Sequence, residues 1–273
     1  MSNIFHCGRF RLSLDKPLIM AILNVTPDSF SGDGLLGRRD QCLAQAELAL
    51  REGAALLDIG GESSRPGAAS VSLQEEMDRV LPIVEALRDC GVPLSIDTVK
   101  PELMSAAIRA GASLINDINA LRAEGALEAV VATDVGVCVM HMQGEPRTMQ
   151  AAPAYDDAVN EVEAFLRQQS ERLHAAGVAR ERILLDPGFG FGKRFAHNQS
   201  LFRALPRLAA LGPLLVGVSR KTMLGDIVGR PAPERVAASA AAALLAAQKG
   251  AAVLRVHDVA ATRDALAVLE QLD

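Results

Sequence analysis

The chain has 273 residues, enough for one (β/α)8 barrel or for two smaller domains. Hydrophobic residues make up 49% of it and charged residues 22%, so it can bury a large core and is not a disordered chain. Its 33 Asp and Glu outnumber its 28 Lys and Arg and give a net charge of −5, so we expect no nucleic-acid partner.

The four cysteines lie far apart in the sequence and show no metal-ligand spacing. This distribution is typical of free thiols in a reducing compartment. The sequence also has no long apolar run of the kind that spans a membrane, and no apolar signal segment at its N-terminus. We therefore expect a cytoplasmic location and no membrane association.

A short hairpin is predicted at the start of the chain, where Phe10, Leu12 and Leu14 alternate with polar residues. We expect it to close the N-terminal end of the main fold. Eight apolar, β-rich runs follow. They are centred on residues 18–23, 55–59, 93–96, 113–115, 135–140, 183–185, 214–218 and 252–256.

Segments with helical spacing lie between these runs, for example at Val80, Val84 and Leu87. The runs are apolar almost throughout, as in a parallel sheet that is covered on both faces. Eight strand and helix units predict an α/β fold, a (β/α)8 TIM barrel with a short N-terminal hairpin, in which residues 1–273 form a single domain. The alternative is an open doubly wound sheet, but the glycine-rich turn that would follow its first strand is absent from the sequence.

Polar residues follow each of the eight runs, at the end of the barrel where the reacting groups of this fold lie. A lone Asp or Asn after a strand is more often a helix cap or a turn former, and Asp58 and Asp117 fit that interpretation. Lys221 and Arg255 cannot cap the N-terminus of a helix. Capping therefore does not explain the whole set.

The polar residues divide into two groups by chemistry. One group supplies positive charge and hydrogen-bond donors: Ser64, Arg65, Lys221, Arg255 and His257. Such groups hold a phosphate or a pyrophosphate. The other group, Asp97, Asn116 and Asp186, supplies oxygens that pair with a heterocycle carrying adjacent N–H and amino donors. The sequence therefore predicts an anionic substrate with a guanine-like or pterin-like ring.

The loops that carry these residues resemble, in order and over essentially the whole chain, those of the dihydropteroate synthase family. The two signature segments of that family are matched by Asn24-Val25-Thr26-Pro27-Asp28-Ser29-Phe30-Ser31 and Gly60-Gly61-Glu62-Ser63-Ser64-Arg65-Pro66-Gly67. Further matches are Asp97-Thr98, Asn116-Asp117-Ile118, His141-Met142-Gln143-Gly144, Asp186-Pro187-Gly188-Phe189-Gly190-Phe191, Ser219-Arg220-Lys221 and Arg255-Val256-His257-Asp258.

The resemblance implies a transferase of folate synthesis, usually a homodimer, with Mg²⁺ as cofactor. It would join 6-hydroxymethyl-7,8-dihydropterin pyrophosphate to 4-aminobenzoate and release pyrophosphate. The pterin would be held by Asp97, Asn116, Asp186 and Lys221, with Met140 and Phe191 lining its pocket. Mg²⁺ would meet Asn24, and pyrophosphate would face Ser64, Arg65, Arg255 and His257. The carboxylate of 4-aminobenzoate would meet Ser219, and its ring Phe30 and Pro66.

The expected catalytic residues are Arg65, Asp97, Lys221 and Arg255. An arylamine gains little from a general base, so departure of pyrophosphate should dominate the barrier. Mg²⁺ and the arginines would neutralise the departing charge, and Asp97 would stabilise positive charge on the methylene carbon and the ring. The expected path is dissociative and SN1-like.

Two other functions stay open at this point. A pterin-dependent methyltransferase could use the same barrel, although it has no need of a pyrophosphate cradle. A non-catalytic pterin-binding protein would bind the pterin and release no pyrophosphate.

Overall fold

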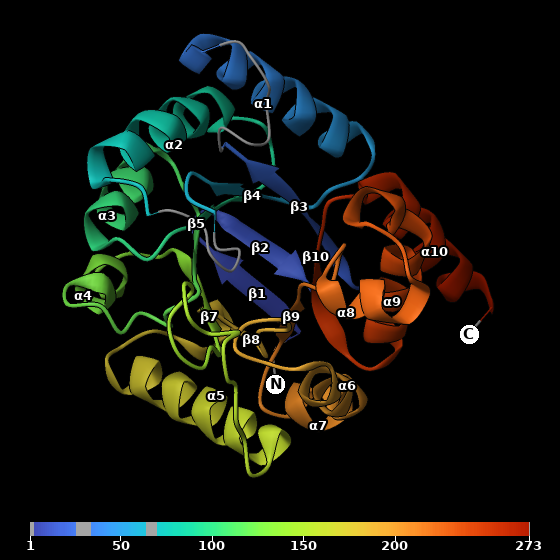
Figure 1. The fold of residues 1–273 in the computed structure, drawn as a ribbon. Helices are drawn as coiled ribbons and strands as arrows, with labels where there is room; N and C mark the ends of the chain where they lie inside the picture. Colours follow the sequence, from blue (N-terminus) through green and yellow to red (C-terminus); the bar gives the residue numbers. More distant parts are fainter. Residues whose placement is uncertain (1–2, 26–33, 64–69, 273) are drawn as a thin grey trace.

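The computed structural model describes residues 3–25, 34–63 and 70–272 (Figure 1). In this part of the chain eight parallel strands close into a barrel, in the order β10-β3-β4-β5-β6-β7-β8-β9. The barrel strands are β3 (Leu18–Asn24), β4 (Leu56–Gly60), β5 (Leu94–Asp97), β6 (Leu114–Asp117), β7 (Gly136–Met140), β8 (Ile183–Asp186), β9 (Leu214–Val216) and β10 (Ala251–Val256).

Helices connect the strands and surround the barrel, as Figure 1 shows. They are α1 (Gly34–Arg51), α2 (Leu73–Leu87), α3 (Pro101–Ala110), α4 (Ala126–Val131), α5 (Ala158–Ala175), α6 (Phe195–Arg203), α7 (Leu205–Ala209), α8 (Thr222–Val228), α9 (Val236–Gln248) and α10 (Val259–Leu272), with 3-10 turns η2 (Arg180–Arg182) and η3 (Ala232–Glu234). The predicted (β/α)8 barrel is confirmed. None of the described helices is long and apolar enough to span a membrane.

The core lies between the strands and the surrounding helices. All five residues of β4 and of β7 are buried, as expected for parallel strands that are covered on both faces. On α2, the buried Val80, Ile83 and Val84 form a stripe at helical spacing toward the sheet. Each such side chain contributes about 1.5–3 kcal/mol when it is fully buried.

The predicted hairpin consists of β1 (Ile4–Cys7) and β2 (Phe10–Ser13), paired antiparallel. Phe5 is fully buried and packs in one cluster with the first residues of several barrel strands, among them Leu56 and Leu114. At Gly136, the first residue of β7, a Cβ would lie 2.6 Å from Cζ of Phe5, so a side chain there would collide with the ring. The hairpin closes the N-terminal end of the barrel and leaves the opposite end for ligands.

Candidate active site

The carboxyl ends of the strands bring six of the predicted site residues to one end of the barrel. The pairing of neighbouring strands sets Asn24 opposite Gly60, Gly60 opposite Asp97, and Asp97 opposite Asn116. These six residues are Asn24 (β3), Asp97 (β5), Asn116 (β6), Asp186 (β8), Lys221 (after β9) and Arg255 (β10). Phe30, Ser64, Arg65 and Pro66 lie outside the described residues.

Arg255 is held between two carboxylates at the floor of the site. Its Nε lies 2.6 Å from Oδ2 of Asp58, and its Nη2 lies 2.7 Å from Oδ2 of Asp97. Asp58 lies inside β4 and its carboxylate accepts from the side chains of Ser95 and Arg255, so the interpretation of this residue as a helix cap or turn former is wrong. The sequence does contain the signal, because a carboxylate inside the apolar run of β4 must find a cation or a donor when it is buried.

Asp117, by contrast, has the role expected of it. Its two carboxylate oxygens accept hydrogen bonds from the backbone N–H groups of Asn119 and Leu121, both at 2.7 Å. These hydrogen bonds order the turn that follows β6, and the charge of Asp117 acts on the floor of the site only at a distance, where it helps to raise the pKa of Asp97.

Asp186 and Lys221 form a second pair of opposite charges near the mouth. Asp186 accepts a hydrogen bond from the N–H of Gly188 at 2.7 Å, and burial raises its pKa although Lys221 opposes the shift. Lys221 donates to the carbonyl of Phe189, and its Nζ lies 4.6 Å from the centre of the Phe191 ring. Burial lowers the pKa of Lys221 to about 8. Lys221 is therefore bound to the loop after β8 as well as to its own turn.

That turn, residues 219–221, is fixed by hydrogen bonds to α9 and to the residue that precedes it. Arg220 has a φ of 57°, a conformation that costs free energy in a non-glycine residue. Its N–H donates to Oγ of Ser239, and Arg235 donates to the carbonyls of Arg220 and Lys221. The sequence shows the motif but not this external support.

Ser219 and His257, which were assigned to different substrates, touch each other. Oγ of Ser219 lies 3.1 Å from Nδ1 of His257 and accepts from its backbone N–H at 3.2 Å. The residue expected to meet the carboxylate of 4-aminobenzoate and one of the residues expected to face the pyrophosphate are thus in direct contact.

The loop after β8 is fastened from beneath by Lys193, whose role the sequence does not reveal. Lys193 is buried, and its Nζ lies 2.9 Å from Nδ1 of His141, 2.9 Å from the Gly188 carbonyl and 3.0 Å from the Phe191 carbonyl. Burial lowers the pKa of Lys193 to about 7, and burial together with Lys193 lowers that of His141 to about 3. A neutral imidazole acceptor fits these contacts.

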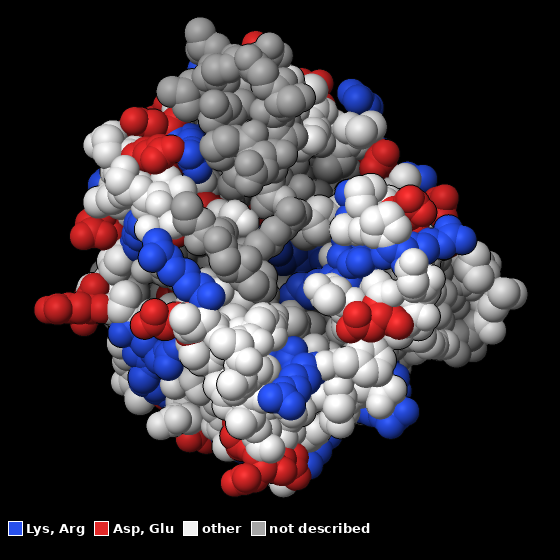
Figure 2. All heavy atoms as spheres, in the orientation of Figure 1, with Lys and Arg blue, Asp and Glu red and all other residues white. Residues whose placement is uncertain are grey.

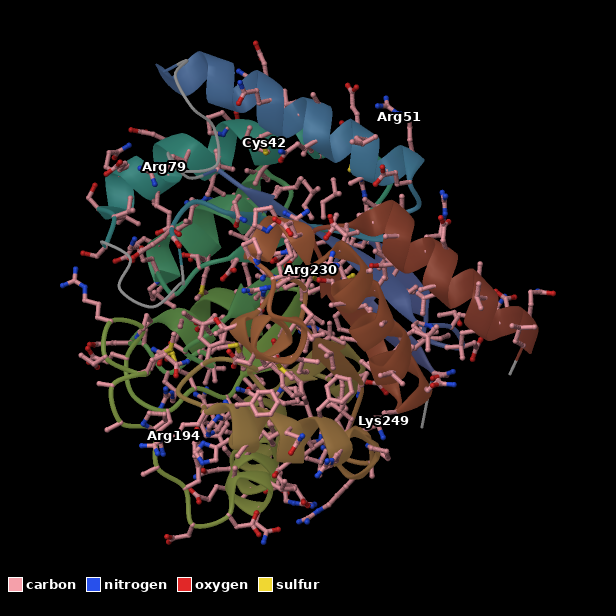
Figure 3. The ribbon with its side chains drawn as sticks, turned by 45° about the vertical axis from the view of Figure 1, so that its right-hand side comes forward. Cys42, Arg51, Arg79, Arg194, Arg230 and Lys249 are labelled. Carbon is pink, nitrogen blue, oxygen red and sulfur yellow. The ribbon has the colours of Figure 1, made fainter. Side chains whose placement is uncertain are left out.

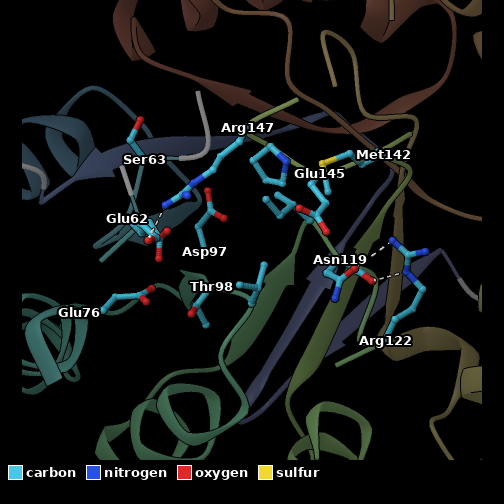
Figure 4. A pocket seen from close by; sticks show the side chains of 15 residues that line it. Glu62, Ser63, Glu76, Asp97, Thr98, Asn119, Arg122, Met142, Glu145 and Arg147 are labelled. Carbon is cyan, nitrogen blue, oxygen red and sulfur yellow. Dashed lines mark hydrogen bonds between the residues drawn. The ribbon is translucent and has the colours of Figure 1, made fainter. Parts of the chain in front are cut away.

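Apolar side chains form the wall of the site. Met140 and Phe191, both predicted to line a pocket, pack in one small cluster with Ile118 and Met142, which were not predicted. The last two also line a cavity of about 800 Å³ that has Asp97 on its opposite wall (Figure 4). Met side chains adapt to a flat ring, so this cluster is suited to a planar ligand.

The charges at this end of the molecule are arranged by depth. Burial, with help from neighbouring Asp58, raises the pKa of Asp97 to about 7, while Arg255 opposes the shift. Seen from outside, Lys and Arg side chains gather at the central hollow on the side of α8 and α9 (Figure 2). The floor carries acceptors and this part of the rim carries cations.

The base of the loop after β4 is tied down by two cations. Lys100 donates to Glu62 at 2.6 Å, to the carbonyl of Val71 at 2.7 Å and to the buried Glu76. Arg79 on α2 (Figure 3) donates to the carbonyl of Gly61 at 2.7 Å. These contacts fix the point at which this loop leaves the barrel.

The fit of a divalent cation can be tested at Gly60. A Cβ built on Gly60 would lie 3.9 Å from Oδ1 of Asn24 and 3.9 Å from Oδ2 of Asp97, so these two oxygens flank the end of β4. Among the described residues no group of three or more His, Cys, Asp or Glu could form a complete metal cage. Mg²⁺ is bound by hard oxygen ligands and completes its coordination with substrate phosphates, and the amide oxygen of Asn24, at the end of β3, is such a ligand.

The chain is similar to known proteins over nearly its full length. Residues 20–257 match the family model described as pterin binding enzyme. A dihydropteroate synthase of Neisseria meningitidis serogroup B is 50% identical, with 99% of this chain and 98% of the relative aligned.

Two solved structures show the same fold at similar identity. The dihydropteroate synthase of Xanthomonas albilineans with 4-aminobenzoic acid has a TM-score of 0.94 and is 50% identical, covering 100% of this chain and 98% of that one. The Burkholderia cenocepacia enzyme, complexed with 7,8-dihydropteroate, has a TM-score of 0.90 and is 53% identical, covering 98% and 96%.

Proposed function

This chain belongs to the pterin-binding enzyme family and, within it, to the dihydropteroate synthases, and from this premise we propose how its own residues perform the reaction. The enzyme is a transferase that condenses 6-hydroxymethyl-7,8-dihydropterin pyrophosphate with 4-aminobenzoate to 7,8-dihydropteroate and pyrophosphate. The observation that carries the residue-level proposal is the floor of oxygen acceptors beside Arg255 and Lys221.

The pterin ring is bound by the groups at the ends of β5, β6 and β8. Asp97, Asn116 and Asp186 offer oxygens to the ring N–H and amino donors, and each good charged hydrogen bond contributes about 1.5–3 kcal/mol. Met140 and Phe191 pack against the ring faces. Lys221, half-buried beside Asp186, donates to the ring acceptors.

The pyrophosphate leaves toward the donors and cations that flank the methylene carbon. Arg255 and His257, with Ser64 and Arg65, bind its oxygens and neutralise the charge that grows as the C–O bond breaks. Asn24 would hold Mg²⁺, which when bound supplies further positive charge to the phosphate oxygens. No general base is needed, because the arylamine is neutral at physiological pH.

Asp97 faces the other charge of the transition state. As pyrophosphate departs, positive charge spreads from the methylene carbon into the ring, and a buried carboxylate beside the ring stabilises it. The path is therefore SN1-like. The amine of 4-aminobenzoate then attacks the methylene carbon and loses one proton to water once the C–N bond has formed, with its carboxylate at Ser219 and its ring under Phe30 and Pro66.

The test is pyrophosphate release from the pterin substrate with and without 4-aminobenzoate. Release that depends on 4-aminobenzoate supports the proposal. Pterin binding without release would favour a non-catalytic pterin-binding protein, and methyl transfer to a corrinoid acceptor would favour the methyltransferase.

Three further expectations stay predictions. The homodimer is supported by exposed apolar side chains on α8, α9 and α10, namely Ile227, Leu245 and Val268. Sedimentation equilibrium would test it. The assignment of residues 1–273 to one pterin-binding domain and the cytoplasmic location are to be tested by limited proteolysis and by fractionation of cells.

A further inference from the structure

Asp58 lies inside the barrel, beneath the residues to which the substrates are assigned. None of its surface is exposed, and it does not line the cavity of Figure 4. Burying a carboxylate in this way costs roughly several kcal/mol of desolvation free energy unless cations and hydrogen-bond donors surround it. Its Oδ1 accepts from Oγ of Ser95 at 2.5 Å and its Oδ2 from Nε of Arg255 at 2.6 Å.

The contact with Arg255 fixes the direction of that side chain. A guanidinium is planar, and Nε and Nη2 are bound to carboxylates on two different strands, β4 and β5. Together these two bonds set the plane of the group. Nη1 makes no hydrogen bond with the part of the chain that the structure describes, so the anchoring leaves donors for a ligand.

Two long contacts with Asn116 orient its amide. Nδ2 of Asn116 lies 3.4 and 3.5 Å from the two oxygens of Asp58. An amide has a donor end and an acceptor end, and a carboxylate attracts only the donor. With Nδ2 turned to Asp58, the end that remains for the pterin is the acceptor Oδ1, which matches the oxygens of Asp97 and Asp186.

We propose that Asp58 is a positioning residue, which sets the plane of Arg255 for the departing pyrophosphate and the amide of Asn116 for the pterin while touching neither substrate. The proposal rests on the proposed function of the site. Stabilisation of a leaving group depends on donors that are already aimed before the bond breaks. A loosely held Arg255 would lose that advantage even in a folded protein.

Asp58→Asn tests this, because it keeps the size of the side chain and removes the charge that holds Arg255 and Asn116. Asp117→Asn is the matched control: Asp117 is equally buried, but its partners are backbone N–H groups. For both variants we would measure urea unfolding, kcat, both KM values, and the affinity of inorganic pyrophosphate with Mg²⁺ by calorimetry.

We expect Asp58→Asn to lower kcat about tenfold or more and to weaken pyrophosphate binding about fivefold, with KM for 4-aminobenzoate changed less than about twofold. Asp117→Asn should lose stability and leave these constants near those of the wild type. If Asp58→Asn does not fold, Ser95→Ala loosens the same carboxylate and should give a smaller change in the same direction.

Equal kinetic constants for the two aspartate variants, or no change in Ser95→Ala where Asp58→Asn is unfolded, would overturn the positioning role. Failure of the proposed function is separable from this result. It would show as a wild type that releases no pyrophosphate, whereas the calorimetric comparison of pyrophosphate binding would still test Asp58.

Discussion

Arg255→Met should destabilise the protein as well as slow the reaction. Met keeps the apolar stem of the side chain but removes both ion pairs, at 2.6 Å to Asp58 and 2.7 Å to Asp97. Asp58 is then a buried charge without its cation, and breaking a buried pair in this way costs about 3–5 kcal/mol. We expect a loss of that size in the free energy of unfolding, measured by urea denaturation at neutral pH.

A double-mutant cycle isolates the pair. Adding Asp58→Asn to Arg255→Met removes the unpaired buried charge. The double variant should therefore lose about 1.5–3 kcal/mol less in the free energy of unfolding than the two single variants lose together. The control cycle pairs Arg255→Met with Asp117→Asn and should be additive, because the carboxylate of Asp117 accepts from the backbone N–H groups of Asn119 and Leu121 and not from Arg255. Additivity within about 0.5 kcal/mol in the Asp58 cycle would refute the ion pair as a stabilising contact.

Three further predictions follow from the site. Lys221→Met should lower kcat/KM about 30- to 900-fold, a loss of about 2–4 kcal/mol in transition-state stabilisation, while the protein stays folded, and near-normal turnover would contradict its assigned role. Burial and the charge of Lys193 lower the pKa of His141 to about 3 in the folded protein, against 6.5 in the unfolded chain, so the contribution of His141 to stability should fall as pH drops from 6.5 toward 3. Asp97 and Asp117, whose pKa values burial raises to about 7 and about 6, contribute with the opposite sign in the same range. In urea titrations across that range, the stability of His141→Gln relative to the wild type should rise as pH falls, whereas that of the control His174→Gln should stay constant. Gly188→Ala should lose activity and stability together, because its φ is 69° and a Cβ would lie 1.9 Å from the His141 carbonyl; unchanged circular dichroism and turnover would contradict it.

The sequence predicts the fold well because the barrel is a repeat of one local pattern. Each apolar run is a strand, and the observed strands agree with the predicted runs to within about two residues at most ends, the usual uncertainty of boundaries. The ends of parallel strands must meet at one edge, so the grouping of Asp97, Asn116 and Asp186 follows from the same argument. Phe30, Ser64, Arg65 and Pro66 lie outside the described residues, and their placement stays a prediction.

The contacts that support the site residues could not be predicted from the sequence, because they join residues that are far apart in the chain and that no local pattern connects. Arg255 meets Asp58 across 197 positions of sequence, and Lys193 meets His141 across 52. Spacing can place a residue on a strand or a loop, but it does not tell which strand lies opposite in a closed barrel. This is why Asp58 was misinterpreted as a cap. Its partner Arg255 lies on β10, which comes close to β4 only when β10 pairs with β3 and closes the barrel.

Asp58 and Lys193, two buried groups whose roles the sequence did not predict, each hold a different part of the site in place. Asp58 is an anion that fixes a cation and an amide, both assigned to direct contact with substrate. Lys193 is a cation that fixes carbonyls of the loop carrying Phe189 and Phe191, and that loop in turn receives Lys221. Ordering a mobile side chain when a ligand binds costs about 0.5–1.5 kcal/mol of conformational entropy. This cost is avoided when the side chain is already held in its binding orientation. Because Arg255 and Lys221 are held by these contacts in the folded protein, their side chains are ordered on folding. Substrate binding therefore does not have to order them.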